Sequence, residues 1–461
     1  MRNPIKLLTS AGALILLTVS LNANAQHLPN FGFENWETAG SSVTYGSGMY
    51  KVDTQRPGNE PVDWNGSSAK KVVTFDVVSM GTDNGNNYVC LTNKFNTLFV
   101  KTSIPGYLTL GTPWIYGDSD INKCNGGTFG GITFNYKPVA LRLKVKRADS
   151  VADEVSYVIA YLWNGTFTSN VGANGDPQDG TQNDVDRAVL GTADASAQVT
   201  GDGKLVATLQ KTIDNTVTEW TEFEIPFEYD EIAGEPSKLN IIISGGDYWT
   251  RTNLKKGTTL WVDDVELVYP TKDYAGKCVT VDLTEDEVST RSAANSEWSD
   301  AKMTVEDYGN VVSTDDTGHK TTTGKVTLGD VTLDGVKLTH YDDYLWLEHN
   351  DDNYTMDGSL HNNGNYLVYL DQPSANQRIK FADTQSATTG IESVDGAESE
   401  PAVFGGQGYI SVAGVHGMVS LYTLTGAKVA EVYVEGEAVI PATAGIVIVA
   451  TPAGAVKCNV K

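Results

Sequence analysis

The chain has 461 residues, of which 33 are basic and 58 are acidic, and its net charge at pH 7 is −25. This excess of negative charge disfavours nucleic acid and anionic membranes as partners, and it suits a soluble protein that meets cations or neutral ligands. A solvated acidic surface is the simplest explanation of the same charge. Glycine is abundant, with 46 residues, and convincing amphipathic helix patterns are almost absent. Short alternating apolar and polar runs therefore predict an all-β chain of several domains.

The first 25 residues have the layout of a cleavable secretory signal. Two basic residues precede an apolar run at 11–21, and the small-residue sequence ANA at 23–25 ends the segment. The apolar run is too short for an ordinary transmembrane helix, and no second long apolar run follows. We expect a mature chain that begins at residue 26 and is secreted or held at the cell surface.

Export permits disulfide bonds. The four cysteines are widely spaced and include no C-x-x-C pair; they are Cys90, Cys124, Cys278 and Cys458. Cys90 with Cys124 is the pair to test, and unpaired buried thiols are the equal alternative. The stability of the fold must therefore come from hydrophobic cores.

Four segments in the middle of the chain have the patterns of strands. Residues 141–146 and 222–229 alternate apolar and charged side chains, which is typical of half-buried strands. Pro226 falls on the wet phase of the second segment and favours an edge position. Residues 155–163 and 239–243 are more continuously apolar, which indicates strands covered on both faces.

Two segments bracket this part of the chain, NFGFENW at 30–36 and GTTLWVDDVELVYP at 257–270. We interpret them as the opening and closing strands of one β-domain. In the closing segment the two-residue alternation slips at Asp263–Asp264, which is the pattern of a β-bulge and can turn an acid toward the interior. A buried acid needs several hydrogen-bond donors or a cation as its partner.

Glu34 in the opening segment and the acidic pair at 263–264 are candidates for a cation site. If the two segments are neighbours, their carboxylate oxygens meet, and hard oxygen ligands suit Ca²⁺. The alternative is that Glu34 accepts hydrogen bonds from backbone donors while Asp263 faces solvent. A structural calcium ion at these acids is therefore one hypothesis, and acids without a bound cation are the other.

Aromatic residues in and beside polar loops are the candidates for ligand contacts. They are Trp114, Tyr116, Trp163 and Trp249, with Arg251 close to the last of them. Sugar rings stack on flat aromatic faces flanked by Asn, Asp and Arg, and Arg251 can donate to hydroxyl groups. The alternative is that these indoles are core or loop-anchoring residues.

The sequence shows no nucleophile motif. It has no G-x-S-x-G, no H-E-x-x-H and no Cys/His pairing. Glycoside hydrolysis needs only two suitably separated carboxylates, one of them with a raised pKa, and 58 acids neither identify nor exclude such a pair. Binding without catalysis is therefore preferred, and a glycoside hydrolase is the alternative.

The character of the chain changes after residue 270. Residues 271–383 contain charged, Thr-rich alternating segments and predict a second, smaller β-domain. Residues 384–403 are rich in Ser, Thr, Gly and Glu and are typical of a linker. Residues 404–461 contain four or five short strands and predict a small β-sandwich.

Six motifs occur in the order seen in a known family. They are NFGFENW at 30–36, PVDWN at 61–65, GGITFNYKPVALRLKVKR at 130–147, TEFEIPFEYD at 221–230, KLNIIISGGDYW at 238–249 and GTTLWVDDVELVY at 257–269. Over roughly residues 30–270 the chain resembles the "putative carbohydrate metabolism domain" of exported Bacteroidetes proteins. The resemblance implies a jelly-roll β-sandwich of the galactose-binding-like type that is associated with polysaccharide use. The family itself has no assigned activity or catalytic residues.

More distant resemblances concern other parts of the chain. The opening FE, a later Trp and the closing DDVEL resemble jelly-roll carbohydrate-binding modules in which such acids hold a structural calcium, and this implies Glu34 and Asp264 as ligands. Residues 271–383 resemble calycin-like β-barrel domains. The tail, with LYTLTGAKV and GIVIV, resembles the C-terminal sorting-type domains of Bacteroidetes exported proteins. That likeness implies targeting or anchoring at the cell surface through outer-membrane or surface partners, and a sandwich that merely caps the chain is the alternative.

Together these observations predict an exported protein that binds a glycan or polysaccharide at the cell surface. Recognition by stacking and hydroxyl hydrogen bonds rather than by charge predicts a modest affinity that salt changes little. The alternatives are a glycoside hydrolase that uses a carboxylate pair and a structural or adhesion protein.

Overall fold

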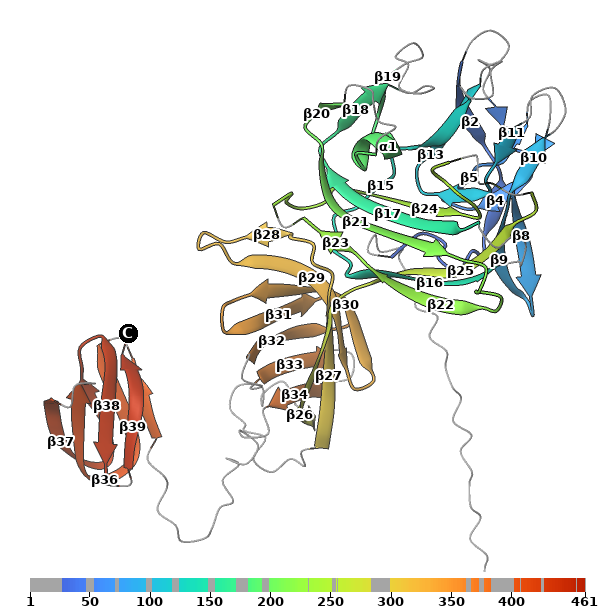
Figure 1. Cartoon of the computed structure of the whole chain (residues 1–461). Coiled ribbons are helices and arrows are strands. Elements are labelled where there is room, and N and C mark those ends of the chain that lie inside the picture. Colours follow the sequence, from blue (N-terminus) through green and yellow to red (C-terminus); the bar gives the residue numbers. More distant parts are fainter. Residues whose placement is uncertain are drawn as a thin grey trace, which may run out of the picture. The chain divides into compact units, whose positions relative to one another are not determined.

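The computed structural model describes most of the chain between residues 27 and 460. The described ranges are 27–46, 54–70, 74–96, 102–117, 124–147, 154–170, 181–192, 199–230, 232–250, 254, 256–282, 299–361, 366–372, 377–382, 402–406, 408–423, 427–452 and 454–460. The expected signal segment and most of the expected linker lie outside these ranges. Two compact units divide between residues 384 and 385 (Figure 1).

Strands dominate both units, which confirms the prediction of an all-β chain. Among the described residues α1 (Asp186–Val189) is the one helix, and it has four residues. No helix in the described ranges is long and apolar enough to cross a membrane.

Two sheets form the sandwich at the start of the first unit. The larger sheet has the order β23-β21-β17-β24-β12-β5, with β15 also beside β24. Its strands are β5 (Asn65–Gly66), β12 (Tyr107–Thr109), β15 (Ile132–Thr133), β17 (Ser156–Asn164), β21 (Lys204–Ile213), β23 (Glu228–Tyr229) and β24 (Lys238–Ser244). The smaller sheet has the order β22-β16-β25-β9-β8. Its strands are β8 (Val78–Asp83), β9 (Asn86–Thr92), β16 (Ala140–Arg147), β22 (Thr221–Pro226) and β25 (Thr259–Val268).

One hydrophobic core contains buried side chains from both sheets, such as Leu143 of β16 and Leu162 of β17. Alternate residues of β17, Ile159 and Tyr161, belong to a second apolar cluster. Strand β17 is therefore covered on both faces, as its continuous apolar run predicts. Strand β22 lies at the edge of its sheet, which confirms the position that Pro226 indicates.

Smaller sheets are built from the segments between these strands. A six-stranded sheet has the order β14-β13-β2-β3-β6-β7, with β2 (Ser41–Gly46), β3 (Thr54–Gln55), β6 (Ala69–Lys70), β7 (Thr74–Phe75), β13 (Thr112–Gly117) and β14 (Asn125–Phe129). Strand β1 (Trp36–Thr38) pairs with β4 (Asn59–Pro61), and β10 (Lys94–Asn96) pairs with β11 (Thr102–Ile104). Strand β18 (Phe167–Asn170) lies between β19 (Thr181–Asn183) and β20 (Thr200–Gly201).

The second sheet system of this unit is a closed antiparallel barrel. Its strands are β26 (Thr271–Asp282), β27 (Ser299–Asp307), β29 (Lys320–Leu328), β30 (Val331–His340), β31 (Tyr344–Asn350), β32 (Thr355–His361), β33 (Tyr366–Gln372) and β34 (Gln377–Ala382), with β28 (Ser313–Thr314) as an addition beside β29. Each of these eight described strands pairs with its chain neighbours, and the last, β34, pairs with the first, β26. The side chains of Met303, Val326 and Leu347 are among those that fill the interior.

The expected boundary near residue 270 stays a prediction, because the barrel and the sandwich belong to one compact unit. The barrel has its own core, yet Tyr308 beside β27 belongs to the core of the sandwich. Its ring lies 5.0 Å from that of Tyr269 and 6.1 Å from that of Tyr136, measured between centroids.

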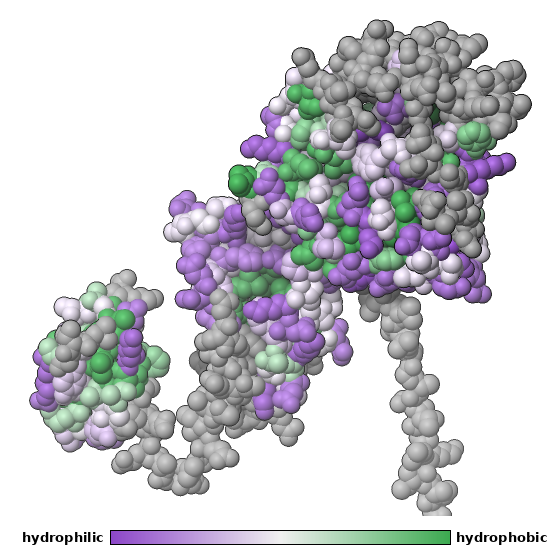
Figure 2. All heavy atoms as spheres, viewed as in Figure 1, coloured by the Kyte–Doolittle hydropathy of each residue, from purple (hydrophilic) through white to green (hydrophobic). Residues whose placement is uncertain are grey.

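The second unit is a small sheet structure. It contains β35 (Ala402–Gly405), β36 (Tyr409–Thr423), β37 (Lys428–Pro441), β38 (Gly445–Thr451) and β39 (Gly454–Val460), with β36 paired to β35, β37 and β38. Its own core includes Ile410, Val434 and Val449. Figure 2 shows apolar side chains on the surface of this unit, and Phe404 and Tyr433 are among the exposed ones.

The interior of the barrel gives a first testable prediction. Val326 of β29 lies opposite Val305 of β27 in the ring of strands, and its side chain is fully buried in the barrel core. We expect Val326→Ala to lower the free energy of opening of β29 by about 2 kcal/mol, because it removes two buried methyl groups and leaves a cavity. Native-state hydrogen exchange of the β29 amides measures this energy. The control Val312→Ala changes a side chain that is 50% exposed and should leave it nearly unchanged. Equal protection in both variants would contradict the burial of Val326 in the barrel core.

Candidate functional site

Strand β25 carries the register slip that its sequence predicts. Arg142 of β16 lies opposite Glu266, while Lys144 lies opposite Asp263, so two residues of β25 face one residue of β16. Asp264 has a φ of 49°, in the left-handed region, as one residue of a β-bulge often has. The slip at Asp263–Asp264 is therefore confirmed as a bulge.

The opening segment lies against β25 at this bulge. The N–H of Val265 donates to the carbonyl oxygen of Phe31 at 2.9 Å, and Gly32 lies close to the carboxylate of Asp264. Phe33 and Trp64 continue into the core, where their rings meet edge to face at 5.6 Å. The two segments therefore lie side by side at the bulge, but residues 30–35 form turns and coil, and the strand of the opening segment begins only at Trp36.

The outer face of the five-stranded sheet is organised in cross-strand rows of charge. In one row Arg142 lies between Glu224 and Glu266, and in the next Lys144 lies between Glu222 and Asp263. Arg142 donates to Glu224 at 2.8 Å, and the Lys144 ammonium donates to Asp264 at 2.7 Å. Opposite charges placed across strands stabilise the pairing, and here they also fix the side chains that line the sheet.

Asp263 is the most enclosed acid of these rows, with an exposed fraction of 6%. One of its oxygens accepts from the Asn86 side chain at 2.6 Å, and the other accepts from the N–H of Asp264 at 2.9 Å. Burial, followed by repulsion from the Asp264 carboxylate, raises the pKa of Asp263, and these hydrogen bonds oppose the shift. The bulge thus sets Asp263 and Asp264 together on the outer face, between the core residues Val262 and Val265. The expectation that the slip turns an acid toward the interior is wrong, and Asp263 is instead enclosed on the outer face by hydrogen-bond donors.

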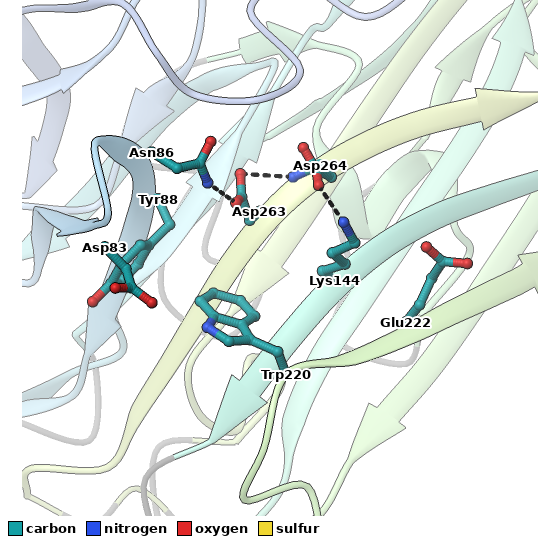
Figure 3. A pocket seen from close by; sticks show the side chains of 8 residues that line it. All are labelled: Asp83, Asn86, Tyr88, Lys144, Trp220, Glu222, Asp263 and Asp264. Carbon is teal, nitrogen blue, oxygen red and sulfur yellow. Dashed lines mark hydrogen bonds and ion pairs between the residues drawn. The ribbon is translucent and has the colours of Figure 1, made fainter.

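A pocket of about 560 Å³ opens above these residues (Figure 3). It is lined by Asp83, Asn86, Tyr88, Lys144, Trp220, Glu222, Asp263 and Asp264. Trp220 is 38% exposed, and its ring meets the ring of Tyr88 edge to face at 5.3 Å. Partial burial raises the pKa of Tyr88, with the charge of Asp83 as a further cause. Two aromatic rings therefore stand among four carboxylates, one amide and one ammonium group.

The expected calcium ligands lie close to this pocket, and both already have protein donors. The carboxylate of Glu34 accepts from the backbone and the side chain of Asn87, and that of Asp264 accepts from Lys144. Within the described residues no group of three His, Cys, Asp or Glu side chains is placed to hold a metal ion. The ammonium of Lys144 supplies positive charge where the calcium was expected, so the donor set fits the ion poorly. Calcium at Glu34 and Asp264 stays an untested prediction.

Most of the aromatic residues expected to contact sugar lie in buried clusters. Trp114 and Tyr116 belong to one cluster, Trp163 lies in the next, and all three side chains are buried. Trp249 is half-buried at the edge of the second cluster, and Arg251 lies outside the described residues. Buried rings present no free face to a ligand, so their placement agrees with the structural alternative for Trp114, Tyr116 and Trp163.

Two of these aromatic residues, Trp114 and Trp249, lie on the buried side chain of Arg187. Its guanidinium lies 5.7 Å from the ring of Trp114 and 6.0 Å from that of Trp249, distances that allow cation–π attraction. Its charge is balanced by Asp186, which accepts from Arg187 and from the hydroxyl of Tyr248. The cluster covers the face of β17 and β24 that points away from the main core.

The pocket residues were not recognised as a site from the sequence. The alternating patterns placed Lys144 and Glu222 on a wet face, and the bulge marked Asp263 and Asp264, but Trp220 precedes its strand in a turn-rich stretch. The one signal in the sequence that could have indicated it is a Trp directly before a strand of alternating charged residues. Cys90 was predicted as a candidate partner in a disulfide bond. It is a free thiol of β9, and burial raises its pKa to about 11.

No protein-family model matches the chain, and no curated protein matches it. Solved structures to which parts of the chain are similar include a "putative glycoside hydrolase" from Bacteroides vulgatus ATCC 8482, with a TM-score of 0.31 and 18% identity over 51% of this chain and 96% of that one. A second is a "putative glycoside hydrolase" from Bacteroides thetaiotaomicron VPI-5482, with a TM-score of 0.29 and 16% identity over 51% of this chain and 72% of that one. Likeness at this level says nothing of what this chain binds.

The raised pKa of Asp263 gives a second prediction. A carboxyl group whose pKa is higher in the folded state than in the unfolded state stabilises the fold when protonated, and this contribution is lost as the pH rises through the folded pKa. As the pH rises through the folded-state pKa of Asp263, we expect the wild-type chain to lose stability relative to Asp263→Asn. The reason is that the amide has no charge to bury. Urea unfolding of both chains across acidic pH measures the difference. A difference that does not vary with pH would show that Asp263 titrates alike in both states.

Proposed function

We propose that this chain binds carbohydrate in the pocket on the outer face of the β22-β16-β25-β9-β8 sheet. The observation that carries the proposal is the pair of rings, Trp220 and Tyr88, standing beside carboxylates and an amide in one open pocket. Apolar faces of sugar rings pack on aromatic side chains, while carboxylates and amides bond to the hydroxyl groups. Export through residues 1–25 and placement at the cell surface through residues 404–461 belong to the same proposal.

The polar groups of the pocket are held in place before a ligand arrives. Lys144 is fixed by Asp264, and Asn86 is fixed by Asp263, which is itself enclosed. Side chains that are already ordered lose little conformational entropy on binding. This order favours a binding site that recognises a defined arrangement of hydroxyl groups.

A glycoside hydrolase is the second candidate, because Asp263 has a raised pKa and other carboxylates line the same pocket. A general acid has to give its proton to the ligand. Both oxygens of Asp263 accept hydrogen bonds from the protein instead. These contacts favour binding over catalysis.

The proposal predicts that Trp220→Ala weakens glycan binding at least about tenfold, or about 1.4 kcal/mol, because a stacking surface is lost. The glycan is first identified with an array, using the chain from residue 26 onward, and its affinity is then measured by calorimetry. Trp346→Ala is the matched control, since Trp346 lies on the barrel and is 36% exposed. If both variants bind like the wild type, the pocket is not the site.

The same glycan decides between the two candidates. We expect it to remain intact after prolonged incubation with the chain, as product analysis by chromatography shows. Hydrolysis that is lost in Glu222→Gln or Asp263→Asn while binding persists would establish the hydrolase instead.

A further inference from the structure

The charges of the pocket restrict the kind of glycan that it accepts. Four of its lining residues are carboxylic acids, namely Asp83, Glu222, Asp263 and Asp264, and one, Lys144, is basic. We propose that the pocket selects glycans that carry a free amino group, such as glucosamine or galactosamine units. This inference rests on the proposed function and names the class of ligand within it.

No basic side chain of strand β16 is available to an anionic sugar, and the last of them, Arg147, is buried. Lys144 is bound to Asp264 at 2.7 Å, and Arg142 is bound to Glu224 at 2.8 Å. Lys146 lies 3.9 Å from Glu219 and over the ring of Trp261. A uronic acid or a sulfated sugar would have to break one of these pairs while facing the remaining carboxylates, which costs free energy. The charges around the pocket therefore disfavour anionic ligands.

Asp83 marks the position for the amino group. It is exposed at the end of β8, and no cationic partner for it is found among the described residues. Its charge acts on Tyr88, whose ring contacts Trp220. Figure 3 shows Asp83 and Tyr88 on one side of Trp220, with Lys144 on the other. An ammonium group beside Asp83 gains a carboxylate partner and lies near two aromatic rings, which attract cations.

Glu222 provides a second negative charge on the opposite side of Trp220 (Figure 3). Arg142 reaches it only at 3.9 Å, and Arg142 is shared with Glu224 and Glu266. A chain of amino sugars that crosses the ring of Trp220 would therefore meet acids on both sides. Binding through these charges depends on salt, in contrast to the salt-insensitive recognition that the sequence predicts.

The test compares oligosaccharides that differ only in the amino group. The chain from residue 26 onward is titrated by calorimetry with glucosamine pentamer and with N-acetylglucosamine pentamer, and with the corresponding galactosamine pair, at a mildly acidic pH that keeps the amines protonated. Oligogalacturonate serves as the anionic ligand. We expect a free amine to bind at least about tenfold more tightly than its acetylated counterpart, with weaker binding at higher salt.

Asp83→Asn should remove most of this preference, because it keeps the shape of the side chain and deletes its charge. Asp343→Asn changes an exposed aspartate in a turn of the barrel and should leave the preference unchanged. Loss of the preference in both variants would mean that the general charge of the chain, and not the pocket, attracts the amine.

The outcomes separate this inference from the proposed function. If neutral glycans bind through Trp220 and no amine binds more tightly, the amino-sugar inference is overturned and carbohydrate binding stands. Oligogalacturonate that binds as tightly as the amines also overturns it. If no glycan of the array and no amino-sugar oligosaccharide binds, both the proposed function and the amino-sugar inference are overturned.

Discussion

Strand β25 has to pair with different partners along its length, and the site follows from the way it does so. From Thr259 to Val262 its neighbour on one side is β9. Beyond the bulge, at Val265, the carbonyl of Phe31 takes over on that side, while β16 continues on the other. The change of partner occurs at the bulge, and beyond it β9 pairs only with β8, in the hairpin that carries Asn86. The pocket opens where β9 leaves β25, so its floor is a consequence of strand pairing.

Local patterns predicted the parts of the fold that depend on single strands. The alternation at 141–146 and the position of Pro226 follow directly from which side chains water solvates, and both agree with the structure. The barrel was expected only as a resemblance, since its closure depends on β34 meeting β26, and no pattern within either strand encodes that meeting. Pairing between segments about a hundred residues apart is set by packing of the whole sheet.

The candidate site was harder to predict than the fold, and Trp114 and Trp220 show why. Trp114 stands in a polar stretch, which suggested exposure, but the indole is buried in an apolar cluster beside Arg187. The polarity of the residues next to a Trp in the sequence does not determine whether other parts of the chain bury its ring. Trp220 is brought to Tyr88 across the face of the sheet, and only the order of the strands reveals that contact.

The position of β25 also orders the assembly of the sandwich during synthesis. β25 is the third strand of its five-stranded sheet, yet it is the last of the five in the sequence. Until residue 268 has been added, β9 and β16 have no strand between them, and each keeps an unpaired edge that can join another chain. The smaller sheet is therefore completed in one late step, immediately before β26 begins at Thr271. A chain that stops short of β25 would carry two open edges in place of a finished sandwich.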